Sequence, residues 1–434
     1  MSLNDTPSGE RTHIVFFGVR NAGKSSLVNA LANQTVSVVS DVAGTTTDPV
    51  RKAMELAAAG PVLIVDTPGI DDAGDVGDLR VQRAEAALNE ADVAVLVVDA
   101  ARGLTSFDDQ LLAAFQARHI PYVVAESKTD LLAESERPGD GDPSLSLPLA
   151  VEGESNIGDA RESVGRDAVV SCESDRASAP SARVRVSART GEGLGDLKHV
   201  LAALAAGTAG ERRLVADLLA PGDVVVLVIP LDSAAPKGRI ILPQQQVLRD
   251  ALEAGAFPCA TSVEGLPQLL GTLTCPPRLV VTDSQAFGRV VELLPASVPL
   301  TSFSILMARY KGDLPAQLRA VRALENLIDG DMVLVAEGCT HHRTCEDIGT
   351  VKLPQWIREI SGANPQFAFT SGRDFPDDLA SYAAVVHCGG CTLNARDMAS
   401  RIQRARHQGV PITNYGMVIA RAHNILNRAL KPLS

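Results

Sequence analysis

The run Gly18–Ser25 could bind the phosphates of a nucleotide. It reads Gly-Val-Arg-Asn-Ala-Gly-Lys-Ser, which fits the phosphate-loop pattern G-x-x-x-x-G-K-S/T. Glycines such as Gly23 let backbone N–H groups approach the phosphates, and a helix that begins at Lys24 adds a positive dipole. We expect the Lys24 ammonium to reach the β- and γ-phosphates and the Ser25 hydroxyl to bind Mg²⁺, with Ser26 next to them at the nucleotide.

Further residues follow in the order that GTP-hydrolysing proteins use. Asp66 ends an apolar run in Asp-Thr-Pro-Gly, so it can hold a Mg²⁺ water while the N–H of Gly69 meets the γ-phosphate. Residues 41–48 resemble the G-T-T-x-D switch of TrmE/Era-like GTPases, in which Thr46 would bind Mg²⁺. Asn21 stands where potassium-activated members of that group place a K⁺-binding Asn, although an Asn that merely suits a turn is the alternative. An Ile follows Gly69 where Ras-type enzymes carry a water-positioning Gln, so we expect slow hydrolysis without K⁺ or a partner chain.

The residues that read the base are expected after the next strands. Ser127-Lys128-Thr-Asp130 resembles the N-K-x-D motif of GTPases, with Ser127 in place of the Asn. Asp130 can accept hydrogen bonds from the guanine N1–H and exocyclic amine, which adenine does not offer, so GTP should be preferred over ATP. Ser187 and Ala188 resemble the last GTPase motif. The shorter Ser127 side chain would bridge neighbouring loops less well, which affects affinity more than base identity.

A second candidate site combines thiols and imidazoles near the end of the chain. Its members form the patterns C-x-H-H and H-C-x-x-C, each shortly after an apolar run: Cys339, His341, His342, His387, Cys388 and Cys391. Carboxyl ends of parallel strands share one edge of a sheet, so the two patterns should meet there. Three thiolates suit an Fe–S cluster, or a zinc ion closed by His341 or His387. A [4Fe–4S] cluster on three cysteines leaves one iron open or weakly held, with His341 or His342 as the candidate fourth ligand.

Apolar runs that alternate with helical patterns should position both sites. We expect strands at His13–Phe17, Val62–Val65, Ala94–Val98, Tyr122–Ala125, Val184–Val186, Val224–Ile229, Arg239–Leu242, Leu279–Val281, Met332–Ala336, Phe367–Thr370 and Ala383–Val386. We expect helices at Lys24–Asn33, Leu79–Asn89, Asp108–Arg118, Leu194–Ala205, Gln246–Ala254, Gln285–Leu294, Leu314–Leu327, Asn394–His407 and Gly416–Leu430. Short apolar strands separated by helices indicate parallel sheets that are covered on both faces.

We therefore predict an α/β fold of three domains, at 1–206, 213–297 and 298–434, the first being a Ras-like P-loop GTPase domain. Within the first, residues 131–182 hold 11 acidic residues against 4 basic ones, and we expect a largely disordered insert there. The continuous apolar run Val224–Ile229, if it lies at a sheet edge, would favour pairing with a second chain. The middle domain should therefore make the protein at least a dimer.

Composition excludes several classes of function. A net charge of -12 argues against a protein built to coat nucleic acid or an anionic membrane, and an aromatic content of 3% argues against base stacking. The apolar runs are far shorter than the ~20 residues of a membrane span. The polar start, Met1–Arg11, lacks the apolar core of a signal peptide, so we expect a cytoplasmic protein. In that reducing compartment seven cysteines, four of them within 339–391, favour metal binding over disulfides.

Together, the GTPase motifs and the C-x-H…H-C-x-x-C pair, separated by 45 residues, resemble the HydF family of [FeFe]-hydrogenase maturation GTPases. The resemblance covers nearly the whole chain outside residues 131–182. It implies a GTPase domain, a middle dimerisation domain and a C-terminal domain that binds a [4Fe–4S] cluster through Cys339, Cys388 and Cys391, with an exchangeable fourth position. It also implies a scaffold that receives a diiron precursor made with the radical-SAM maturases HydE and HydG and delivers it to the apoprotein HydA.

Two other functions remain open at this point. One is an RNA-associated GTPase of the TrmE/Era sort, for which we find no G-x-x-G beside a basic helix. The other is a regulatory GTPase in which zinc is purely structural. Iron content and colour after anaerobic purification would separate these alternatives.

Overall fold

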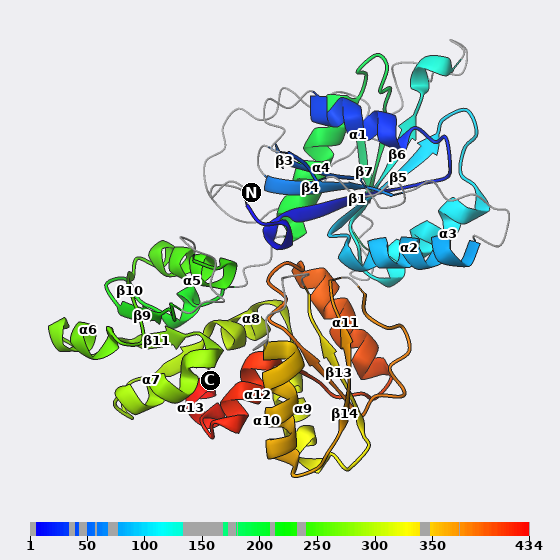
Figure 1. The fold of residues 1–434 in the computed structure, drawn as a ribbon. Coiled ribbons are helices and arrows are strands. Elements are labelled where there is room, and N and C mark those ends of the chain that lie inside the picture. The colour runs from blue at the N-terminus through cyan, green and yellow to red at the C-terminus, as the bar shows by residue number, and fades with distance from the viewer. Residues whose placement is uncertain are drawn as a thin grey trace. The chain divides into compact units, whose positions relative to one another are not determined.

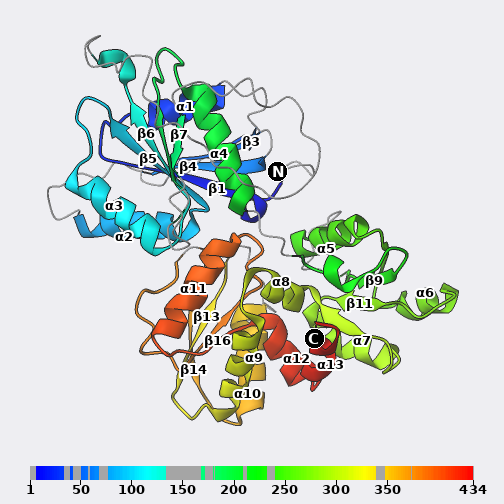
Figure 2. The same cartoon turned by 180° about the vertical axis from the view of Figure 1, so that it is seen from behind.

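The computed structural model describes residues 6–33, 40–42, 50–56, 59–67, 77–132, 168–171, 179, 181–208, 213–231, 240–338, 348–372 and 374–433. The chain divides into two compact units, Met1–Gly210 and Glu211–Ser434 (Figures 1 and 2). Each is described by itself. Within the described residues, the longest apolar helices fall short of what a membrane crossing needs.

The first unit is a mixed sheet with helices on both faces. Its described strands are β1 (Thr12–Phe17), β2 (Ser40–Val42), β3 (Val50–Leu56), β4 (Gly60–Asp66), β5 (Val93–Asp99), β6 (Tyr122–Ser127), β7 (Ala168–Ser171) and β8 (Ser181–Arg185), in the order β2-β3-β4-β1-β5-β6-β8-β7. The central strands β4, β1, β5, β6 and β8 are parallel, whereas β2–β3, β3–β4 and β7–β8 pair antiparallel. The helices are α1 (Lys24–Asn33), α2 (Gly77–Glu90), α3 (Ser106–Ala117) and α4 (Leu194–Thr208).

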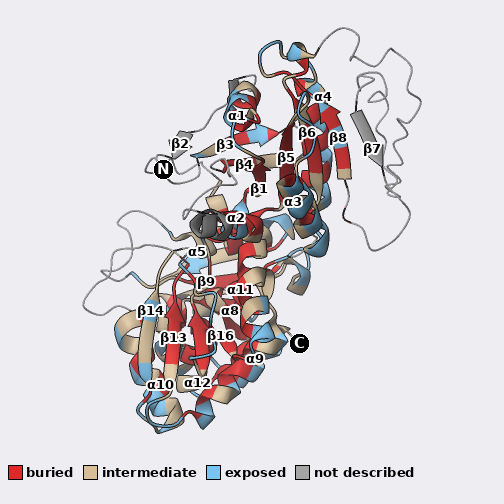
Figure 3. Ribbon diagram, turned by 90° about the vertical axis from the view of Figure 1, so that its right-hand side faces the viewer, coloured by how far each residue is buried: buried red, intermediate tan, exposed pale blue. Residues whose placement is uncertain are grey.

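Alternation along β1 divides the core of this unit into two layers. Ile14 and Phe16 pack with apolar residues of α1 and α4, and Val15 and Phe17 pack with those of α2 and α3. All four side chains are fully buried, as are their neighbours along the central strands (Figure 3). A strand that is covered on both faces reads as a continuous apolar run, which explains why the sequence pattern located it.

The second unit contains two parallel sheets, each of four described strands. The first has the order β10-β9-β11-β12 and the second the order β14-β13-β15-β16. Their strands are β9 (Val224–Val228), β10 (Phe257–Thr261), β11 (Leu279–Thr282), β12 (Leu300–Ser302), β13 (Met332–Ala336), β14 (Gln366–Thr370), β15 (Ala384–His387) and β16 (Ile412–Asn414). The helices are α5 (Leu242–Glu253), α6 (Leu266–Thr272), α7 (Phe287–Leu293), α8 (Phe303–Lys311), α9 (Leu314–Ala323), α10 (Leu353–Ser361), α11 (Ala395–His407), α12 (Tyr415–Ala422) and α13 (Leu426–Leu430).

Helices near the end of the chain share a buried cluster with the first sheet of the second unit. Val226 of β9 belongs to the same cluster as Met417 of α12 and Ala429 of α13, so the end of the chain packs back on the first sheet. Strand β12 also continues that sheet beyond the predicted boundary at 297/298. The predicted boundary thus lies inside one compact unit, and the division into three domains stays a prediction.

Most predicted strands and helices are confirmed, but residues 240–242 of the strand expected at Arg239–Leu242 form no strand. Leu242 instead begins α5, where Pro243 suits the first turn and Gln244 Oε1 accepts the N–H of Ile241 at 3.0 Å. The next strand is β10, which the sequence pattern missed. Pro258 interrupts its apolar run, and proline is tolerated in β10 because this strand lies at the edge of its sheet. The single helix expected at Gly416–Leu430 is also wrong, because the chain leaves the helix between α12 and α13.

Val224–Ile229 does not meet the condition of lying at a sheet edge. Strand β9 pairs with β10 on one side and β11 on the other, so its backbone groups are already used within the sheet. Continuous burial, rather than an edge position, accounts for its uninterrupted apolar run.

The insert at 131–182 is not wholly irregular. Ala168–Ser171 forms β7 and pairs with β8, whose first residues Ser181 and Ala182 also fall inside the predicted insert. The two central valines give this short segment strand propensity despite its acidic surroundings. Residues 133–167 and 172–178 lie outside the described residues.

Candidate functional site

The phosphate loop joins β1 to α1 as predicted. Gly18 has φ 140°, and a Cβ there would collide with the Val97 carbonyl oxygen, so only glycine fits. Gly23 has φ 98°. The buried Lys24 Nζ donates to the carbonyl oxygens of Gly18 (2.7 Å) and Val19 (2.9 Å). The Lys24 ammonium therefore binds carbonyl oxygens of its own loop. A bound nucleotide would offer phosphate oxygens as alternative acceptors for the same protons.

The two described residues predicted to serve Mg²⁺ contact each other. Ser25 Oγ donates to Asp66 Oδ2 at 2.6 Å. Burial raises the pKa of Asp66, opposed by this hydrogen bond and by the charges of Lys24 and Lys52. Asp66 Oδ1 is buried and has no hydrogen-bond partner among the described residues. A buried carboxylate oxygen beside a serine hydroxyl fits a Mg²⁺ ion or one of its waters.

The base-reading residues also come together. Asp130 Oδ1 accepts a hydrogen bond from Ser187 Oγ at 2.7 Å, and Asp130 Oδ2 lies 3.2 Å from Arg189 Nε. Arg189 was missed in the sequence, although it directly follows the Ser-Ala pair. Lys128 has φ 60° and its ammonium pairs with Asp99 Oδ2 at 2.8 Å. Burial would raise the pKa of Asp99, but this contact and the N–H of Ala101 lower it overall.

Ser127 contacts the phosphate loop despite its short side chain. Its hydroxyl lies within hydrogen-bond distance of the Ala22 carbonyl oxygen and 3.1 Å from that of Val98. The single hydroxyl proton serves one of these oxygens at a time. A serine at this position therefore links the loop predicted to read the base to the predicted phosphate loop.

Asn21 adopts a left-handed conformation, with φ 61°, and is exposed. Asn tolerates this conformation better than most residues, so the turn alone explains its presence. Its role in binding K⁺ stays a prediction. The predicted residues Thr46, Gly69, Cys339, His341 and His342 lie outside the described residues.

The two described thiols lie where the sequence placed them. Ala336 at the end of β13 is the register partner of His387 at the end of β15, so these carboxyl ends are neighbours. Cys388 Sγ accepts the N–H of Gly338 at 3.0 Å and that of Gly390 at 3.4 Å. The two strand ends are therefore neighbours, as predicted, and Gly338 is the last described residue before Cys339. The meeting of Cys339 with Cys388 and Cys391 stays a prediction.

Glycine is required within the C-x-x-C run. Gly390 has φ 60°, and a Cβ there would collide with the Cε atom of Met398. Burial raises the pKa of the Cys388 thiol to about 11, although the N–H groups of Gly338 and Gly390 oppose the shift. N–H donors directed at a sulfur suit a thiolate bound to a metal. Burial disfavours the negative charge of that thiolate, and a bound cation would offset it. No group of three metal-ligating side chains occurs within the described ranges, which include two of the three predicted thiols.

His387 is engaged at both ring nitrogens. Nε2 lies 3.0 Å from Arg401 Nη1, and Nδ1 lies 2.9 Å from the carbonyl oxygen of Cys388. Since a guanidinium can only donate, Nε2 accepts and Nδ1 carries the proton. Burial, with the charge of Arg401 added, lowers the pKa of His387 to about 3. In this arrangement His387 has no nitrogen left for a metal ion, which removes the zinc site closed by His387.

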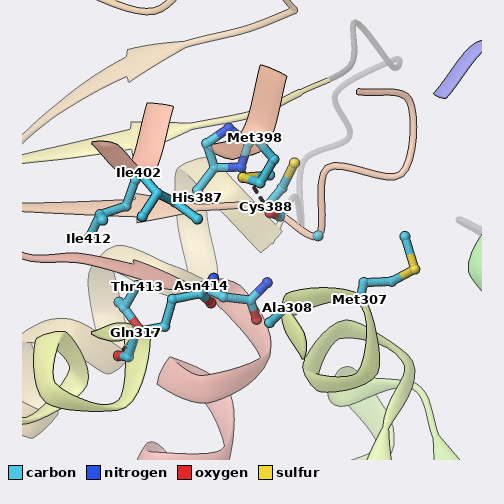
Figure 4. Close-up of a pocket in the computed structure, with 11 residues that line it drawn as sticks. Met307, Ala308, Gln317, His387, Cys388, Met398, Ile402, Ile412, Thr413 and Asn414 are labelled. Carbon is cyan, nitrogen blue, oxygen red and sulfur yellow. Dashed lines mark hydrogen bonds between the residues drawn. The ribbon is translucent and has the colours of Figure 1, made fainter. Parts of the chain in front are cut away.

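Arg401 was missed because no local motif contains it. It lies on α11, where its Nε pairs with Asp397 Oδ1 at 3.1 Å and its Nη2 donates to the Gly372 carbonyl at 3.0 Å. In Figure 4, His387 lies with Cys388 and Met398 at one side of a small pocket, opposite Thr413 and Asn414. The pocket has room for little more than one water molecule, so it is a gap in the packing behind the loop rather than a substrate site.

Three family models match consecutive parts of the chain. Residues 13–128 match the "50S ribosome-binding GTPase" model, residues 214–312 the "Hydrogen maturase F dimerization domain" and residues 315–432 the "Hydrogen maturase F tetramerization domain". The order is that of the HydF architecture. The chain belongs to the hydrogen maturase F family.

Membership in the hydrogen maturase F family agrees with the predicted α/β fold and supports a homo-oligomer. Curated proteins similar to part of the chain include two kinds of GTPase. The chain is 37% identical over 154 residues to the tRNA modification GTPase MnmE of Laribacter hongkongensis, covering 35% of this chain and 34% of that protein. It is 40% identical over 129 residues to the GTPase Der of Maridesulfovibrio salexigens, covering 29% and 28%. The chain thus spans about a third of the length of the curated relatives it matches.

Among solved structures, a bacterial selenocysteine-specific elongation factor EF-Sec is similar at 15% identity and a TM-score of 0.31, over 47% of this chain and 30% of that one. A TM-score this low supports no conclusion about the fold or function of this chain. The family model and the GTPase relatives support GTP hydrolysis by the first unit.

Proposed function

We propose that this protein is a GTP-hydrolysing scaffold for assembly of the [FeFe]-hydrogenase active site. In this proposal it receives a diiron precursor as cargo and delivers it to the apo-hydrogenase. The observation that carries the proposal is the junction of β13 and β15, where the Gly338 N–H donates to Cys388 Sγ. That junction lies in the part of the chain that matches the hydrogen maturase F family, so a thiol site and a GTPase occur in one polypeptide.

The proposed nucleotide chemistry uses residues of the first unit. Lys24 exchanges its contacts with the Gly18 and Val19 carbonyls for phosphate oxygens. Ser25 and Asp66 hold Mg²⁺ or its water, and Thr46 adds a ligand. Asp130, held by Ser187, reads guanine. These assignments rest on the contacts described above together with the motif positions, and K⁺ bound at Asn21 is part of the same proposal.

The proposed cluster site uses Cys339, Cys388 and Cys391 as thiolate ligands of a [4Fe–4S] cluster. When bound, such a cluster supplies an iron with an exchangeable position to which a second metal unit can attach. The chain orients the ligands: Cys388 directly follows β15, the glycine turn leads from it to Cys391, and N–H groups stabilise the charge on the Cys388 sulfur. His341 or His342 is the proposed weak fourth ligand. His387 instead fixes the loop backbone through the Cys388 carbonyl.

The proposed partners are a second copy of the chain, the radical-SAM maturases HydE and HydG, and the hydrogenase apoprotein HydA. The dimerisation and tetramerisation domains support self-association, and the remaining partners follow from the family alone. A cytoplasmic location is part of the same proposal.

Anaerobic purification followed by a maturation assay tests the proposal. We expect brown protein with about four irons per chain, the content of a [4Fe–4S] cluster. Added to HydE, HydG and apo-HydA, it should yield active hydrogenase, and Cys391→Ser should not. Stoichiometric zinc without iron, together with full maturation by Cys391→Ser, would show instead a GTPase with a structural zinc site.

A further inference from the structure

Helix α8 ends in a buried lysine that contacts the C-x-x-C loop. Lys311, the last residue of the helix, exposes only 2% of its surface. Its ammonium donates to the main-chain carbonyls of Gly390 at 3.2 Å, Cys391 at 3.3 Å and Leu393 at 2.6 Å. An ammonium has three protons, and here three carbonyl oxygens of one short loop converge on it.

The position of Lys311 is set by the packing of α8 and not by the loop alone. Ser302 caps the helix by accepting the N–H of Ile305 at 3.2 Å. Ile305 and Met307 of the helix are buried in the two apolar clusters of the first sheet, and Cys391 packs against the second of these clusters. A rigid helix that is anchored elsewhere therefore delivers the ammonium to a fixed point beside the loop.

The loop is held from its other side as well. Thr392 Oγ1 donates to the Gly338 carbonyl at 2.8 Å, which links the two loops that carry the cysteine patterns. The Leu393 N–H donates to the Gly390 carbonyl at 3.1 Å and closes a turn. Lys311 binds the carbonyls at both ends of that turn, so losing its ammonium would remove a donor from each of them, including the buried Leu393 carbonyl.

The charge of Lys311 has a second consequence. A positive charge fixed beside the C-x-x-C run favours a more negative charge on any metal centre that its thiolates hold.

We propose that Lys311 is a positioning residue for the candidate cluster site, which fixes the Cys388–Cys391 loop and places a positive charge beside that loop. The part that concerns a cluster rests on the proposed function. The part that concerns the loop does not, because it can be measured on metal-free protein.

The substitutions Lys311→Met and Lys311→Gln separate these two effects. Methionine keeps the apolar stem and removes donor and charge, whereas glutamine keeps N–H donors and removes only the charge. Arg309→Met is the matched control. Arg309 lies two residues earlier on α8, but its guanidinium pairs with Asp217 and the Leu214 carbonyl, which lie far along the chain from the loop.

In metal-free protein, the rate at which iodoacetamide alkylates the thiolate forms of Cys388 and Cys391 measures how firmly the loop is held. Dividing each observed rate by the thiolate fraction, taken from the pH dependence of the same reaction, removes the effect of the lost charge on ionisation. We expect about tenfold faster alkylation in Lys311→Met, on the scale of lost hydrogen bonds to a charged donor. Lys311→Gln should lie between, and Arg309→Met should match the unmodified protein. Unchanged alkylation in a Lys311→Met protein with normal circular dichroism would overturn the positioning role. If Lys311→Met does not fold, an alkylation rate in Lys311→Gln equal to that of the unmodified protein overturns it.

In iron-loaded protein, a chelator should remove iron from Lys311→Met about 10–100-fold faster, the usual scale for groups that support metal ligands. The midpoint potential should fall in both Lys311 variants and stay unchanged in Arg309→Met, because only the former lose positive charge at the site. A potential that is equal in all proteins would overturn the charge effect. If the unmodified chain takes up no iron, the proposed cluster is refuted, and the alkylation rates still decide the positioning role.

Discussion

The nucleotide site and the C-x-x-C loop both follow parallel strands, yet they are held in different ways. At the nucleotide site, the groups expected to bind ligand are occupied by one another: Lys24 by carbonyls of its own loop, Ser25 by Asp66, and Asp130 by Ser187. Ligand binding must exchange these contacts. At the loop, the supporting groups are N–H donors and the buried Lys311, which a ligand on the sulfurs need not displace.

The difference indicates two kinds of site. Contacts that a ligand replaces make binding reversible and responsive, as a nucleotide cycle requires. Contacts that remain in place preorganise the thiols, which favours long retention of a metal centre. Changes at the two sites should therefore have separate effects, and the following predictions test that separation.

The largest expected effect is on GTP hydrolysis in Lys24→Ala. Removing a buried ammonium directed at the phosphates should lower kcat by at least about a hundredfold. Iron content should stay unchanged if the sites are independent. Phosphate release and iron analysis of the same preparation measure both, and a parallel loss of iron would contradict the separation.

The converse experiment replaces a thiol. Cys388→Ser should lose nearly all bound iron, because a serine hydroxyl is a poor ligand for a soft metal centre. Cys275→Ser, at an exposed thiol outside the candidate site, is the matched control and should keep its iron. GTP turnover should survive in both variants, and its loss in Cys388→Ser alone would show that the cluster site controls the GTPase.

A smaller effect is expected for base recognition. Asp130→Asn should weaken GTP binding by about a hundredfold, since it removes the charged acceptor for two guanine donors. It should favour xanthine nucleotide, whose ring presents a carbonyl at the exchanged position. Competition binding with GTP, XTP and ATP measures the change. Equal turnover of ATP and GTP by the unmodified protein would remove the guanine assignment.

The sequence predicted the parts of both sites that depend on short motifs. The phosphate loop, the Asp130–Ser187 pair and the C-x-x-C turn each follow from spacing that places residues at strand ends. Arg401 and Lys311 were not predicted, because they reach the loop from helices that only tertiary packing brings near. Nothing in the residues beside Lys311 distinguishes it from an exposed lysine at a helix end.

The fold was predicted to a similar extent and for similar reasons. Buried parallel strands such as β1 and β13 have continuous apolar runs, so they were located. Strands without a continuous apolar run were missed: β10 contains Pro258, and β3 carries charged residues such as Arg51 and Glu55 among its buried ones. The sequence could not place β9 inside its sheet, because its neighbour β10 was not recognised as a strand.

A weaker effect is expected where Ser127 meets the phosphate loop. Ser127→Ala removes the hydroxyl near the Ala22 carbonyl and should weaken GTP binding about tenfold, the scale of one buried hydrogen bond. Ser127→Asn, which restores the residue of the N-K-x-D motif, should bind at least as tightly as the unmodified protein. Isothermal titration of the two variants compares them, and unchanged affinity in Ser127→Ala would mean that the contact contributes nothing.

The smallest expected effect concerns potassium. If the Asn21 amide helps to hold K⁺, turnover should rise when Na⁺ is replaced by K⁺ at constant ionic strength. Ala at this position would strain a backbone with φ 61°, so a loss of response in Asn21→Ala could come from a distorted loop. Glycine adopts this conformation without strain, so Asn21→Gly removes the amide and keeps the turn. An Asn21→Gly protein that turns over GTP normally but no longer distinguishes K⁺ from Na⁺ would support the cation role. A retained response would mean that Asn21 only suits its turn. A partner chain would then have to position the attacking water, which a Gln does in Ras-type enzymes.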